Sequence, residues 1–442
     1  MAYNQYGGQQ NSAYGNNGYA QPSGQHHMTA DEIWAQESGS NLVNGGRKEQ
    51  YDNAYYGSSA GAAKSGSKKK WWWIGGAVLL AAIIAGVVAG VVVSQNNKKK
   101  DSNGGSSGSG GSGSGGGSGS GGNFAKDDRL HKVFWGMAYD PEGAVPPMCG
   151  AKQADVTKDI QILSQLTTRL RLYSANCNVT ALVMQAIKDT GVNMTVYPAI
   201  YVNDDDTIFT YQMNNLTDAI TKYGAEIVDG VSGATASESP TDTNQIAVGN
   251  EYMLNQVGSV TSGAAYTTAL NYLSQRIQTF NSTLQGMNLK KHIPVGTGDA
   301  GSVFSTTMAT KIDFFMSNVH PWFGKLPASQ AAAWTWSYFD ENNVQVAAQA
   351  PNKPNMYLAE TGWPTSANET KFLTLGGAQA GMSDLQTFLD TYICQANANG
   401  TEYFYFEGFD QPWKEIYGGV EPYWGLFDKD RNLKQPLTIP TC

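Results

Sequence analysis

The stretch Ile246-Ala247-Val248-Gly249-Asn250-Glu251 is a short apolar run that ends in an amide and a carboxylate. The stretch Asn355-Met356-Tyr357-Leu358-Ala359-Glu360 repeats this pattern later in the chain. Short apolar runs that end in polar residues are typical of buried strands. The two stretches therefore predict two strands, each of which carries a glutamate at its C-terminal end.

Six further runs of the same kind lie before, between and after these two stretches. The eight predicted strands are Val133–Tyr139, Thr168–Tyr173, Asn193–Tyr201, Ile246–Asn250, Ile293–Gly296, Phe314–Val319, Asn355–Glu360 and Glu402–Glu407. The helical segments predicted between them include Thr157–Leu166, Thr180–Asp189, Thr267–Asn281, Ala328–Glu341 and Ser383–Ala398. Alternating strands and helices indicate parallel βαβ units, and eight units close most economically into a barrel. We therefore predict an α/β fold, a (β/α)₈ TIM barrel, for residues 123–442.

The part of the chain before the predicted barrel has a different composition. Residues 1–67 are rich in Gly, Gln, Asn, Ser and Tyr without apolar periodicity, which predicts a disordered tail. Residues 71–93 are uncharged and apolar, and as a helix they would cover roughly 35 Å, enough to cross a bilayer. Residues 101–122 are nearly pure Gly and Ser, which predicts a flexible linker. Because the apolar run begins too late for a cleaved signal peptide, we predict a transmembrane signal-anchor helix.

The distribution of sequons and cysteines predicts the orientation of this anchor. All of them follow the apolar run, as expected for a domain that folds in an oxidising, glycosylating compartment. The N-terminal tail is therefore predicted to be cytosolic and the barrel extracellular, as in a single-pass type II membrane protein. The sequons begin at Asn178, Asn193, Asn215, Asn281, Asn368 and Asn399, and the cysteines are Cys149, Cys177, Cys394 and Cys442.

Several other classes of function are disfavoured by the sequence. Five histidines and four scattered cysteines show no spacing for a zinc site. No phosphate-cradling glycine motif follows a predicted strand. The isoelectric point of about 5.2 gives no indication of nucleic-acid binding. We therefore expect no metal, no cofactor and no nucleic-acid partner.

The two strand-end glutamates, Glu251 and Glu360, are the minimum equipment for cleaving a glycosidic bond. With the motifs around them, the chain from about Lys132 to its C-terminus resembles glycoside hydrolase family 17, in particular its fungal membrane-anchored β-1,3-glucanases. The motifs that carry this resemblance are Phe134–Tyr139, Arg171–Tyr173, Val248–Glu251, His320–Phe323, Glu360–Pro364, Phe406–Asp410 with Trp413-Lys414, and Gly425–Phe427.

The resemblance implies a retaining enzyme that cleaves internal β-1,3-glucosidic bonds of cell-wall glucan by double displacement. It implies Glu251 as the general acid/base and Glu360 as the nucleophile. The other site residues that it implies are Asn250 for the sugar 2-hydroxyl, Arg171 and His320 for orienting the nucleophile, and Glu407 and Lys414 as a second shell or sugar contact. Tyr139, Trp322 and Trp363 are candidate sugar-stacking residues, although aromatic rings also fill barrel tops.

The resemblance also places the protein at the plasma membrane, with the catalytic domain facing the cell wall and β-1,3-glucan as its partner. Two alternatives to the hydrolase stay open. A β-1,3-glucanosyltransferase would use the same residues but resolve the intermediate with a sugar hydroxyl. A catalytically inactive barrel would serve as a glucan-binding, wall-anchoring protein.

The four cysteines allow three connectivities. Cys149 follows the first predicted strand and Cys177 the second, so their loops should be neighbours on one barrel face. This favours a Cys149–Cys177 bond and leaves Cys394 to pair with Cys442. A polar stretch, Gly233–Gln245, interrupts the family pattern before the fourth strand, and we expect a mobile surface loop there, on the face opposite the glutamates.

Overall fold

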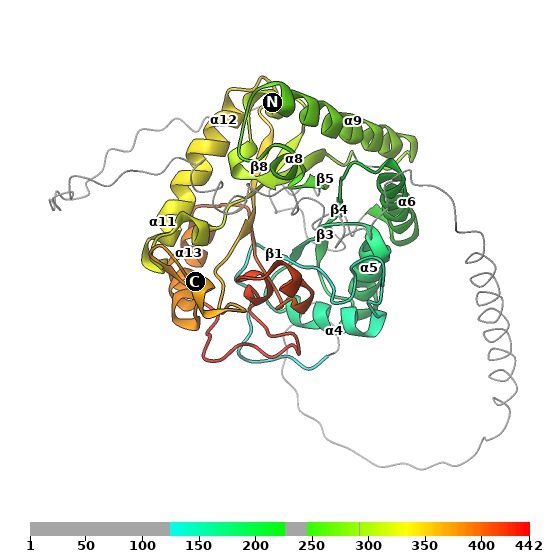
Figure 1. The fold of residues 1–442 in the computed structure, drawn as a ribbon. Coiled ribbons are helices and arrows are strands. Elements are labelled where there is room, and N and C mark those ends of the chain that lie inside the picture. The colour runs from blue at the N-terminus through cyan, green and yellow to red at the C-terminus, as the bar shows by residue number, and fades with distance from the viewer. Residues whose placement is uncertain (1–123, 226–244, 291) are drawn as a thin grey trace, which may run out of the picture. The chain divides into compact units, whose positions relative to one another are not determined.

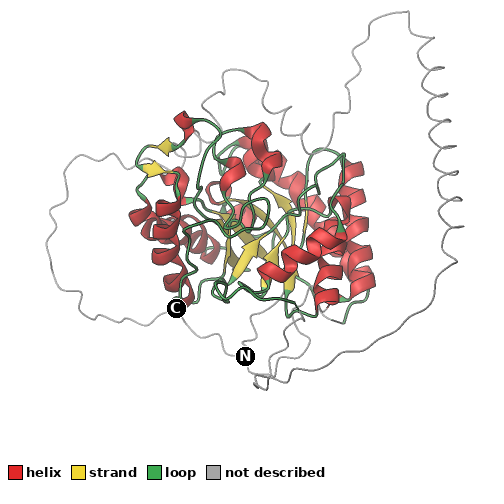
Figure 2. Cartoon of the chain, turned by 90° about the horizontal axis from the view of Figure 1, so that it is seen from below, coloured by secondary structure: helices red, strands yellow, loops and turns green. Residues whose placement is uncertain are grey.

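The computed structural model describes residues 124–225, 245–290 and 292–442 (Figure 1). Strands occupy the centre and helices surround them, as the two perpendicular views in Figures 1 and 2 show. In the described part of the chain the central sheet has nine strands in the order β3-β2-β1-β11-β8-β7-β6-β5-β4, and all of its strand pairs are parallel. This architecture confirms the predicted α/β barrel.

The strands of the barrel are short, and the helices between them are longer. The central strands are β1 (Gly136–Ala138), β2 (Arg169–Arg171), β3 (Thr195–Tyr197), β4 (Ala199–Ile200), β5 (Ile246–Asn250), β6 (Val295–Ala300), β7 (Phe314–Asn318), β8 (Asn355–Thr361) and β11 (Tyr403–Tyr405). The helices are α4 (Gln153–Leu163), α5 (Val179–Thr190), α6 (Asp206–Tyr223), α8 (Tyr252–Val257), α9 (Ala264–Gly286), α10 (Thr306–Ala309), α11 (Ala328–Phe339), α12 (Gln345–Ala348) and α13 (Met382–Ala398). A small antiparallel hairpin, β9 (Thr374–Leu375) and β10 (Ala378–Gln379), follows β8.

Pro198 explains why nine strands form a barrel of eight units. It separates β3 from β4, which otherwise belong to one extended segment, predicted as Asn193–Tyr201. Proline has no N–H to contribute to a ladder, so the strand is interrupted at this point. Its carbonyl still accepts the N–H of Ala247 at 3.1 Å, while the carbonyl of Tyr197 accepts the N–H of Leu172 at 3.0 Å. The two ends of the sheet therefore meet at this segment and close the barrel.

Two apolar cores hold the barrel together. The larger core lies between the strands and the surrounding helices, and the smaller one fills the barrel interior with Tyr197, Ala199, Ala247, Phe314, Met316, Tyr357, Ala359 and Phe404. Because side chains alternate along a strand, Phe314 and Met316 join the interior core whereas Phe315 joins the outer one. Gln245 also lies buried just before β5 and donates to the Tyr357 hydroxyl at 2.6 Å.

Several predictions fall on residues that the structure does not describe. The tail (1–67), the signal-anchor helix (71–93), the linker (101–122) and most of the polar stretch before β5 lie outside the described residues. Within residues 124–225, 245–290 and 292–442, no helix combines the length and apolar character needed to cross a membrane. Gln245, which we assigned to the surface loop, belongs to the approach to β5 and is buried, so that assignment is wrong for this residue.

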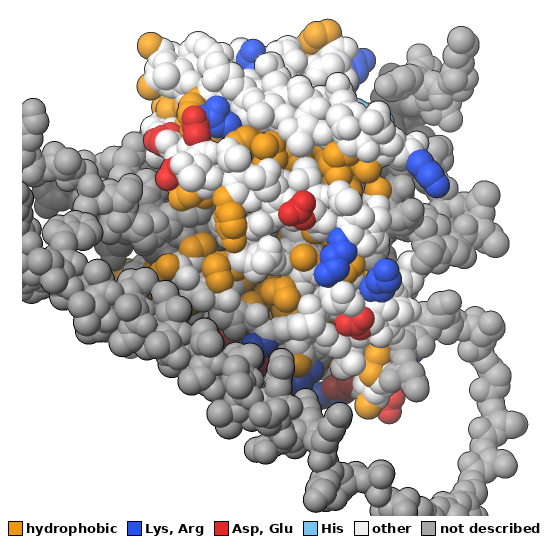
Figure 3. All heavy atoms as spheres, turned by 90° about the vertical axis from the view of Figure 1, so that its right-hand side faces the viewer, with side chains coloured by type: hydrophobic (Ala, Val, Ile, Leu, Met, Phe, Trp, Pro, Cys, Tyr) orange, Lys and Arg blue, Asp and Glu red, His pale blue; other side chains and the backbone are white. Residues whose placement is uncertain are grey.

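The outer surface shows mixed chemistry. On the face drawn in Figure 3, acidic and basic side chains lie scattered among uncharged polar side chains and small apolar patches. Charged residues make up 15% of the chain, which agrees with a surface that relies mainly on uncharged polar groups. This face of the barrel is therefore polar without a strong local charge.

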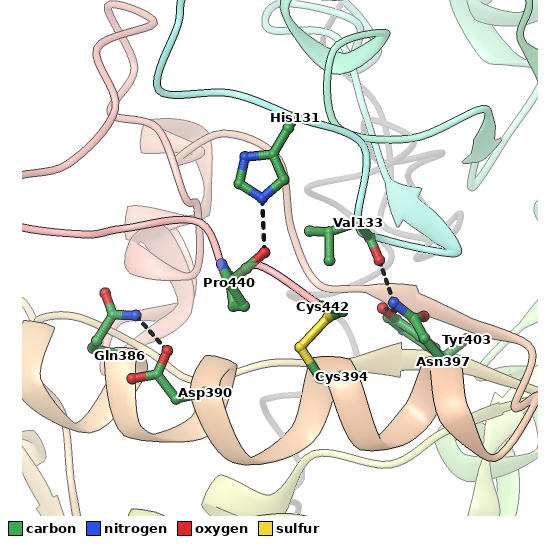
Figure 4. Close-up of a disulfide and its surroundings, with 9 residues drawn as sticks. All are labelled: His131, Val133, Gln386, Asp390, Cys394, Asn397, Tyr403, Pro440 and Cys442. Atoms are coloured by element: carbon green, nitrogen blue, oxygen red, sulfur yellow. Dashed lines mark hydrogen bonds between the residues drawn. A yellow bond between two sulfur atoms is a disulfide. The ribbon is translucent and has the colours of Figure 1, made fainter.

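Both disulfides have the favoured pairing. Cys149 bonds Cys177 across 28 residues, and Cys394 bonds Cys442 across 48 residues. The second bond fastens the C-terminal segment to α13 (Figure 4). Hydrogen bonds support the same segment, because Gln386 accepts the N–H of Thr438 at 2.8 Å and donates to its carbonyl at 3.0 Å.

Removal of the Cys394–Cys442 bond in a double alanine variant is expected to lower the free energy of unfolding by about 2–4 kcal/mol, because the unfolded chain is no longer restrained. Chemical denaturation under non-reducing conditions measures this loss. A Gln386→Ala variant is the control, since it removes the hydrogen bonds to Thr438 and keeps the covalent link. An unchanged denaturation midpoint in the double variant would show that the segment is held without the disulfide.

Candidate active site

Polar side chains from four strands meet at the C-terminal edge of the barrel. Arg171 ends β2, Asn250 ends β5, Asn318 ends β7 and Glu360 lies next to the end of β8. In the β7–β8 register Asn318 is paired with Glu360. Because all of these strands are parallel, their C-terminal ends lie at one edge, where barrel enzymes place their chemistry.

Glu360 is buried between two cationic or ionisable partners. Arg171 Nη1 donates to Glu360 Oε1 at 2.5 Å, and His320 Nε2 lies 2.9 Å from Glu360 Oε2. Burial by itself raises the pKa of this carboxyl, but the Arg171 charge and the His320 hydrogen bond outweigh burial and lower the pKa to about 2. Glu360 is therefore ionised at neutral pH, as a nucleophile must be.

The surroundings of Glu251 favour its protonated form, in contrast to those of Glu360. It is half-buried, and its Oε1 accepts a hydrogen bond from Asn318 Nδ2 at 2.9 Å. Burial and the negative charge of Glu360 raise the pKa of Glu251 to about 7, against the lowering effects of Asn318, His320 and Arg171. The two carboxyls are thus held in different protonation states, which is how acid and nucleophile roles are divided between two carboxyl groups.

A polar chain links the two glutamates. Arg171 binds Glu360 through Nη1 and Asn250 Oδ1 through Nη2, the latter at 2.7 Å. Asn318 Nδ2 contacts both Asn250 Oδ1, at 3.4 Å, and Glu251. The Arg171 guanidinium also lies over the Tyr173 ring, with 4.4 Å from Cζ to the ring centroid. One arginine therefore fixes Glu360 and the amide of Asn250 beside Glu251 at the same time.

The local backbone turns Glu251 out of the strand. Gly249 has a φ of 104° and Glu251 a φ of 53°, both in the region that favours glycine. A Cβ at Gly249 would meet Thr297 Oγ1 at 2.9 Å, so the position excludes larger residues. Directly after Glu251 the chain enters α8. The Gly249-Asn250-Glu251 sequence thus ends the strand and starts the helix within one turn.

A second ionisable cluster lies beside this pair. Lys414 Nζ donates to Glu407 Oε1 at 3.1 Å and lies 4.5 Å from the centroid of the Phe406 ring. Burial raises the pKa of Glu407 to about 8, although the Lys414 ammonium acts in the opposite direction. The Glu360 charge contributes to the raised pKa of Glu407, so the cluster is electrostatically coupled to Glu360.

Three residues predicted to contact sugar follow strand ends at this edge but are buried in the apolar core. Tyr139 is buried, and its hydroxyl donates to Asp159 Oδ2 at 2.7 Å. Trp322 and Trp363 are 2% and 0% exposed, and they pack edge to face at 5.6 Å. Trp363 also donates its ring N–H to the Gln379 carbonyl at 2.8 Å. The structure therefore corrects these expectations: the three rings belong to the core, because burial leaves none of them a free face.

Other residues at this edge escaped the sequence reasoning. Asn318 and Asp299 lie at the ends of β7 and β6, and Tyr173 carries the ring under Arg171. Burial raises the pKa of Glu421, although the charge of Lys414 acts in the opposite direction. A search for polar residues at the ends of all eight strands would have found Asn318, and a longer sixth strand would have included Asp299.

The predicted glycosylation positions differ in accessibility. Asn178, Asn193, Asn368 and Asn399 are exposed, whereas Asn215 and Asn281 are half-buried. The Asn215 amide also donates to the Ala175 carbonyl at 3.0 Å. Asn215 is therefore the least available acceptor in the folded domain.

A parallel barrel with two glutamates of well-separated pKa values at this edge has the equipment of a glycoside hydrolase. Comparison with known proteins gives the same class. A family model described as the BtgE/BtgC glycoside hydrolase domain matches residues 136–425. The chain therefore belongs to the BtgE/BtgC glycoside hydrolase family, which supports the predicted glycoside hydrolase family and leaves the predicted membrane anchoring untested.

Two fungal relatives are similar over the same part of the chain. The probable glucan endo-1,3-beta-glucosidase btgC of Aspergillus fumigatus is 35% identical over 334 residues, which cover 71% of this chain and 44% of the relative. The glucan endo-1,3-beta-glucosidase btgC of Emericella nidulans is 36% identical over 328 residues, with 71% and 47% covered. The chain thus spans less than half the length of these relatives.

Two solved structures share the fold. A glycoside hydrolase family 17 β-1,3-glucanosyltransferase from Rhizomucor miehei is 22% identical with a TM-score of 0.53, over 70% of this chain and 98% of that one. An endo-laminarinase from Formosa is 17% identical with a TM-score of 0.51, over 68% and 85%. At these identities the likeness concerns the barrel fold.

An Arg171→Lys substitution is expected to lower kcat/KM by about 10²-fold, the scale on which misplacement of a reacting group acts. Lysine keeps the charge but cannot bridge Glu360 and Asn250 as the guanidinium does. The nucleophile works only when ionised, so weaker stabilisation of Glu360 should also move the acidic limb of the pH profile upward. Steady-state kinetics between pH 3 and 7 test both effects. An unchanged profile would show that Arg171 does not control the nucleophile.

Proposed function

We propose that this domain hydrolyses internal β-1,3-glucosidic bonds of a glucan with retention of the anomeric configuration. The observation that carries the proposal is the placement of both glutamates at one barrel edge, with Arg171 and His320 on Glu360 and Asn318 on Glu251. These surroundings separate the pKa values of Glu251 and Glu360, to about 7 and about 2. The substrate class is supported by the two btgC relatives, which are named glucan endo-1,3-beta-glucosidases.

In the first step the Glu360 carboxylate attacks the anomeric carbon while Glu251 donates its proton to the departing glycosidic oxygen. The bond from the anomeric carbon to that oxygen breaks, and a glycosyl ester on Glu360 forms. Arg171 and His320 hold Glu360 in position for this attack. Asn250, fixed by Arg171, is placed beside the acid to bind the sugar 2-hydroxyl.

In the second step Glu251, now ionised, takes a proton from a water molecule that attacks the anomeric carbon. The ester bond to Glu360 breaks, the product keeps the β configuration, and Glu251 is protonated again. A sugar hydroxyl in place of water would give a glucanosyltransferase with the same residues. The Rhizomucor miehei protein named above shows that this barrel fold also occurs in a β-1,3-glucanosyltransferase.

We also propose that residues 71–93 anchor the protein in the plasma membrane, with the barrel facing cell-wall glucan that it trims or remodels. The proposal rests on the length and apolar character of that run, and on the position of all six sequons and four cysteines after it. Protease protection and glycosidase sensitivity of the full-length protein in sealed membrane vesicles test this orientation.

The activity is tested by a product time course with the full-length protein and reduced laminarin oligosaccharides. Mass spectrometry follows product length, and NMR of the new anomeric proton reports configuration. Shorter products that are initially β support a retaining hydrolase, and products longer than the substrate support the transferase. Binding without turnover would assign the protein to the class of glucan-binding proteins.

A further inference from the structure

Glu251 occupies the residue position that normally caps a helix, but it does not cap one. It directly precedes α8, and its side chain makes no hydrogen bond to the helix N-terminus. Its carboxylate instead receives the Asn318 amide at 2.9 Å. The first N–H groups of a helix lack partners within the helix and need an acceptor from elsewhere.

Asp299 of β6 provides that acceptor. Its carboxylate accepts the N–H of Met253 at 2.7 Å and the N–H of Leu254 at 3.2 Å, which lie in the first turn of α8. It also accepts the N–H of Ala300 at 2.9 Å, and it is fully buried. The preceding residue, Gly298, accepts the N–H of Glu251 at 3.1 Å. Two adjacent residues of β6 therefore hold the backbone on both sides of the Glu251 side chain.

We propose that Asp299 is a positioning residue, which caps α8 in place of Glu251 and so leaves the Glu251 carboxyl free to work as acid and base. The inference rests on the proposed function, since it concerns the same acid/base. Without Asp299, the N–H groups of Met253 and Leu254 need another acceptor, and Glu251 stands at the N-cap position from which a side chain usually supplies one. An ordinary cap of this kind would draw Glu251 away from Asn318 and stabilise its ionised form.

The groups around Glu251 indicate how the loss of Asp299 should change the pKa of Glu251. Glu360 of β8 raises the pKa of Glu251, while His320 after β7 and Arg171 of β2 lower it. Asp299 of β6 and Glu251 repel one another, and this repulsion contributes to the raised pKa of Asp299, which burial brings to about 8. Loss of Asp299 frees the N–H groups of Met253 and Leu254, and hydrogen bonds from these groups to the Glu251 carboxylate would lower the pKa of Glu251.

The test compares Asp299→Ala and Asp299→Asn with a matched control, Asp205→Ala, in the full-length protein. Asp205 caps α6 in the ordinary way, through the N–H groups of Thr207 at 2.8 Å and Ile208 at 3.3 Å. Each variant is assayed on β-1,3-gluco-oligosaccharides, which need acid assistance, and on a 2,4-dinitrophenyl β-glycoside of the same sugar, whose leaving group needs none. The parameter compared is kcat/KM, which reports the first chemical step.

For Asp299→Ala we expect a fall of about tenfold or more on oligosaccharides, within the range of general acid catalysis, and about twofold or less on the dinitrophenyl substrate. The basic limb of the pH profile should move to lower pH. Asp299→Asn should show the same pattern with a smaller loss, because its amide oxygen keeps one acceptor. Asp205→Ala should leave both activities unchanged. Equal losses on the two substrates, or the same selective loss in Asp205→Ala, would overturn the proposal.

A readout that does not depend on turnover separates this inference from the proposed function. Carboxyl ¹³C NMR titration, assigned with a Glu251→Gln variant, gives the pKa of Glu251 in the parent and in both Asp299 variants. A lower pKa in the variants supports positioning by Asp299, and an unchanged pKa contradicts it. If the parent cleaves no glucan, the proposed function fails while the titration still decides the role of Asp299. If Asp299→Ala does not fold, Asp299→Asn gives the same readouts.

Discussion

Replacement of Glu360 with glutamine is expected to lower kcat on β-1,3-glucan by on the order of 10⁴-fold or more, the scale on which loss of a nucleophile acts. Glutamine has the same shape but cannot form the glycosyl ester. Substrate binding should persist, because the other groups at the barrel edge are unchanged. Turnover of laminarin oligosaccharides and binding by calorimetry measure the two effects separately.

The substitution also leaves Arg171 without its anionic partner, so its effect on folding needs a control. Asp159→Asn is matched to it, since Asp159 is buried and bonded to Arg431 Nε at 2.5 Å, away from the two glutamates. Both variants should lose stability on thermal unfolding, because each removes a buried carboxylate that is paired with an arginine. Only Glu360→Gln should lose turnover below its melting temperature. Turnover above a few per cent of the parent in Glu360→Gln would exclude Glu360 as the nucleophile.

A Glu251→Ala substitution is expected to lower kcat/KM on glucan by about 10²- to 10⁴-fold, the usual contribution of general acid catalysis. The first step on a dinitrophenyl glycoside should be nearly unaffected, because that leaving group departs without a proton. Breakdown of the glycosyl ester should then be slow, since no base activates water. Added azide, which needs no base, should restore turnover and yield a β-glycosyl azide. An equal loss on both substrates without azide rescue would contradict the assignment.

The pH dependence of the parent enzyme follows from the same pair. Glu251 donates only when protonated, so kcat/KM should fall as the pH rises above about 7, the pKa of this carboxyl. Glu360 attacks only when ionised, so the acidic limb should lie near pH 2, below the range in which most domains stay folded. The basic limb should disappear in Glu251→Ala. A basic limb that persists in this variant would belong to another group.

The alternation of apolar runs and amphipathic segments was sufficient to predict the barrel. Ile246–Asn250 and Asn355–Glu360 match β5 and β8 closely, because their apolar residues are contiguous and their polar ends are sharp. The sixth strand is different: Ile293–Gly296 was predicted, whereas β6 covers Val295–Ala300. Its second half contains Gly298 and Asp299, and both residue types are rare in strands. They are tolerated here because the Gly298 carbonyl and the Asp299 carboxylate accept backbone N–H groups from Glu251 and Met253. Sequence pattern cannot reveal hydrogen-bond partners that come from a distant part of the chain.

Prediction of the candidate site meets the same limit, because contacts between distant residues cannot be read from the sequence pattern. Arg171, Asn250, Glu251, His320 and Glu360 could be placed from strand ends and family resemblance, and the structure brings them together. The aromatic residues could not be sorted, because a tryptophan near a barrel edge serves a sugar or a core equally well. Trp363 binds the carbonyl of Gln379 on the β9–β10 hairpin, an element that the sequence reasoning did not predict.

The ends of the barrel domain lie side by side. His131 Nε2 is 2.8 Å from the Pro440 carbonyl, and Asn397 donates to the Val133 carbonyl at 2.7 Å, next to the Cys394–Cys442 bond (Figure 4). His131 and Val133 precede β1, whereas Glu251 follows β5 and Glu360 lies at the C-terminal end of β8, at the opposite edge of the barrel. The domain can therefore be immobilised on a bead by either end with its reactive edge facing the solution. Adjacent ends also suit circular permutation, in which a short peptide joins the old termini and a loop elsewhere supplies the new ones.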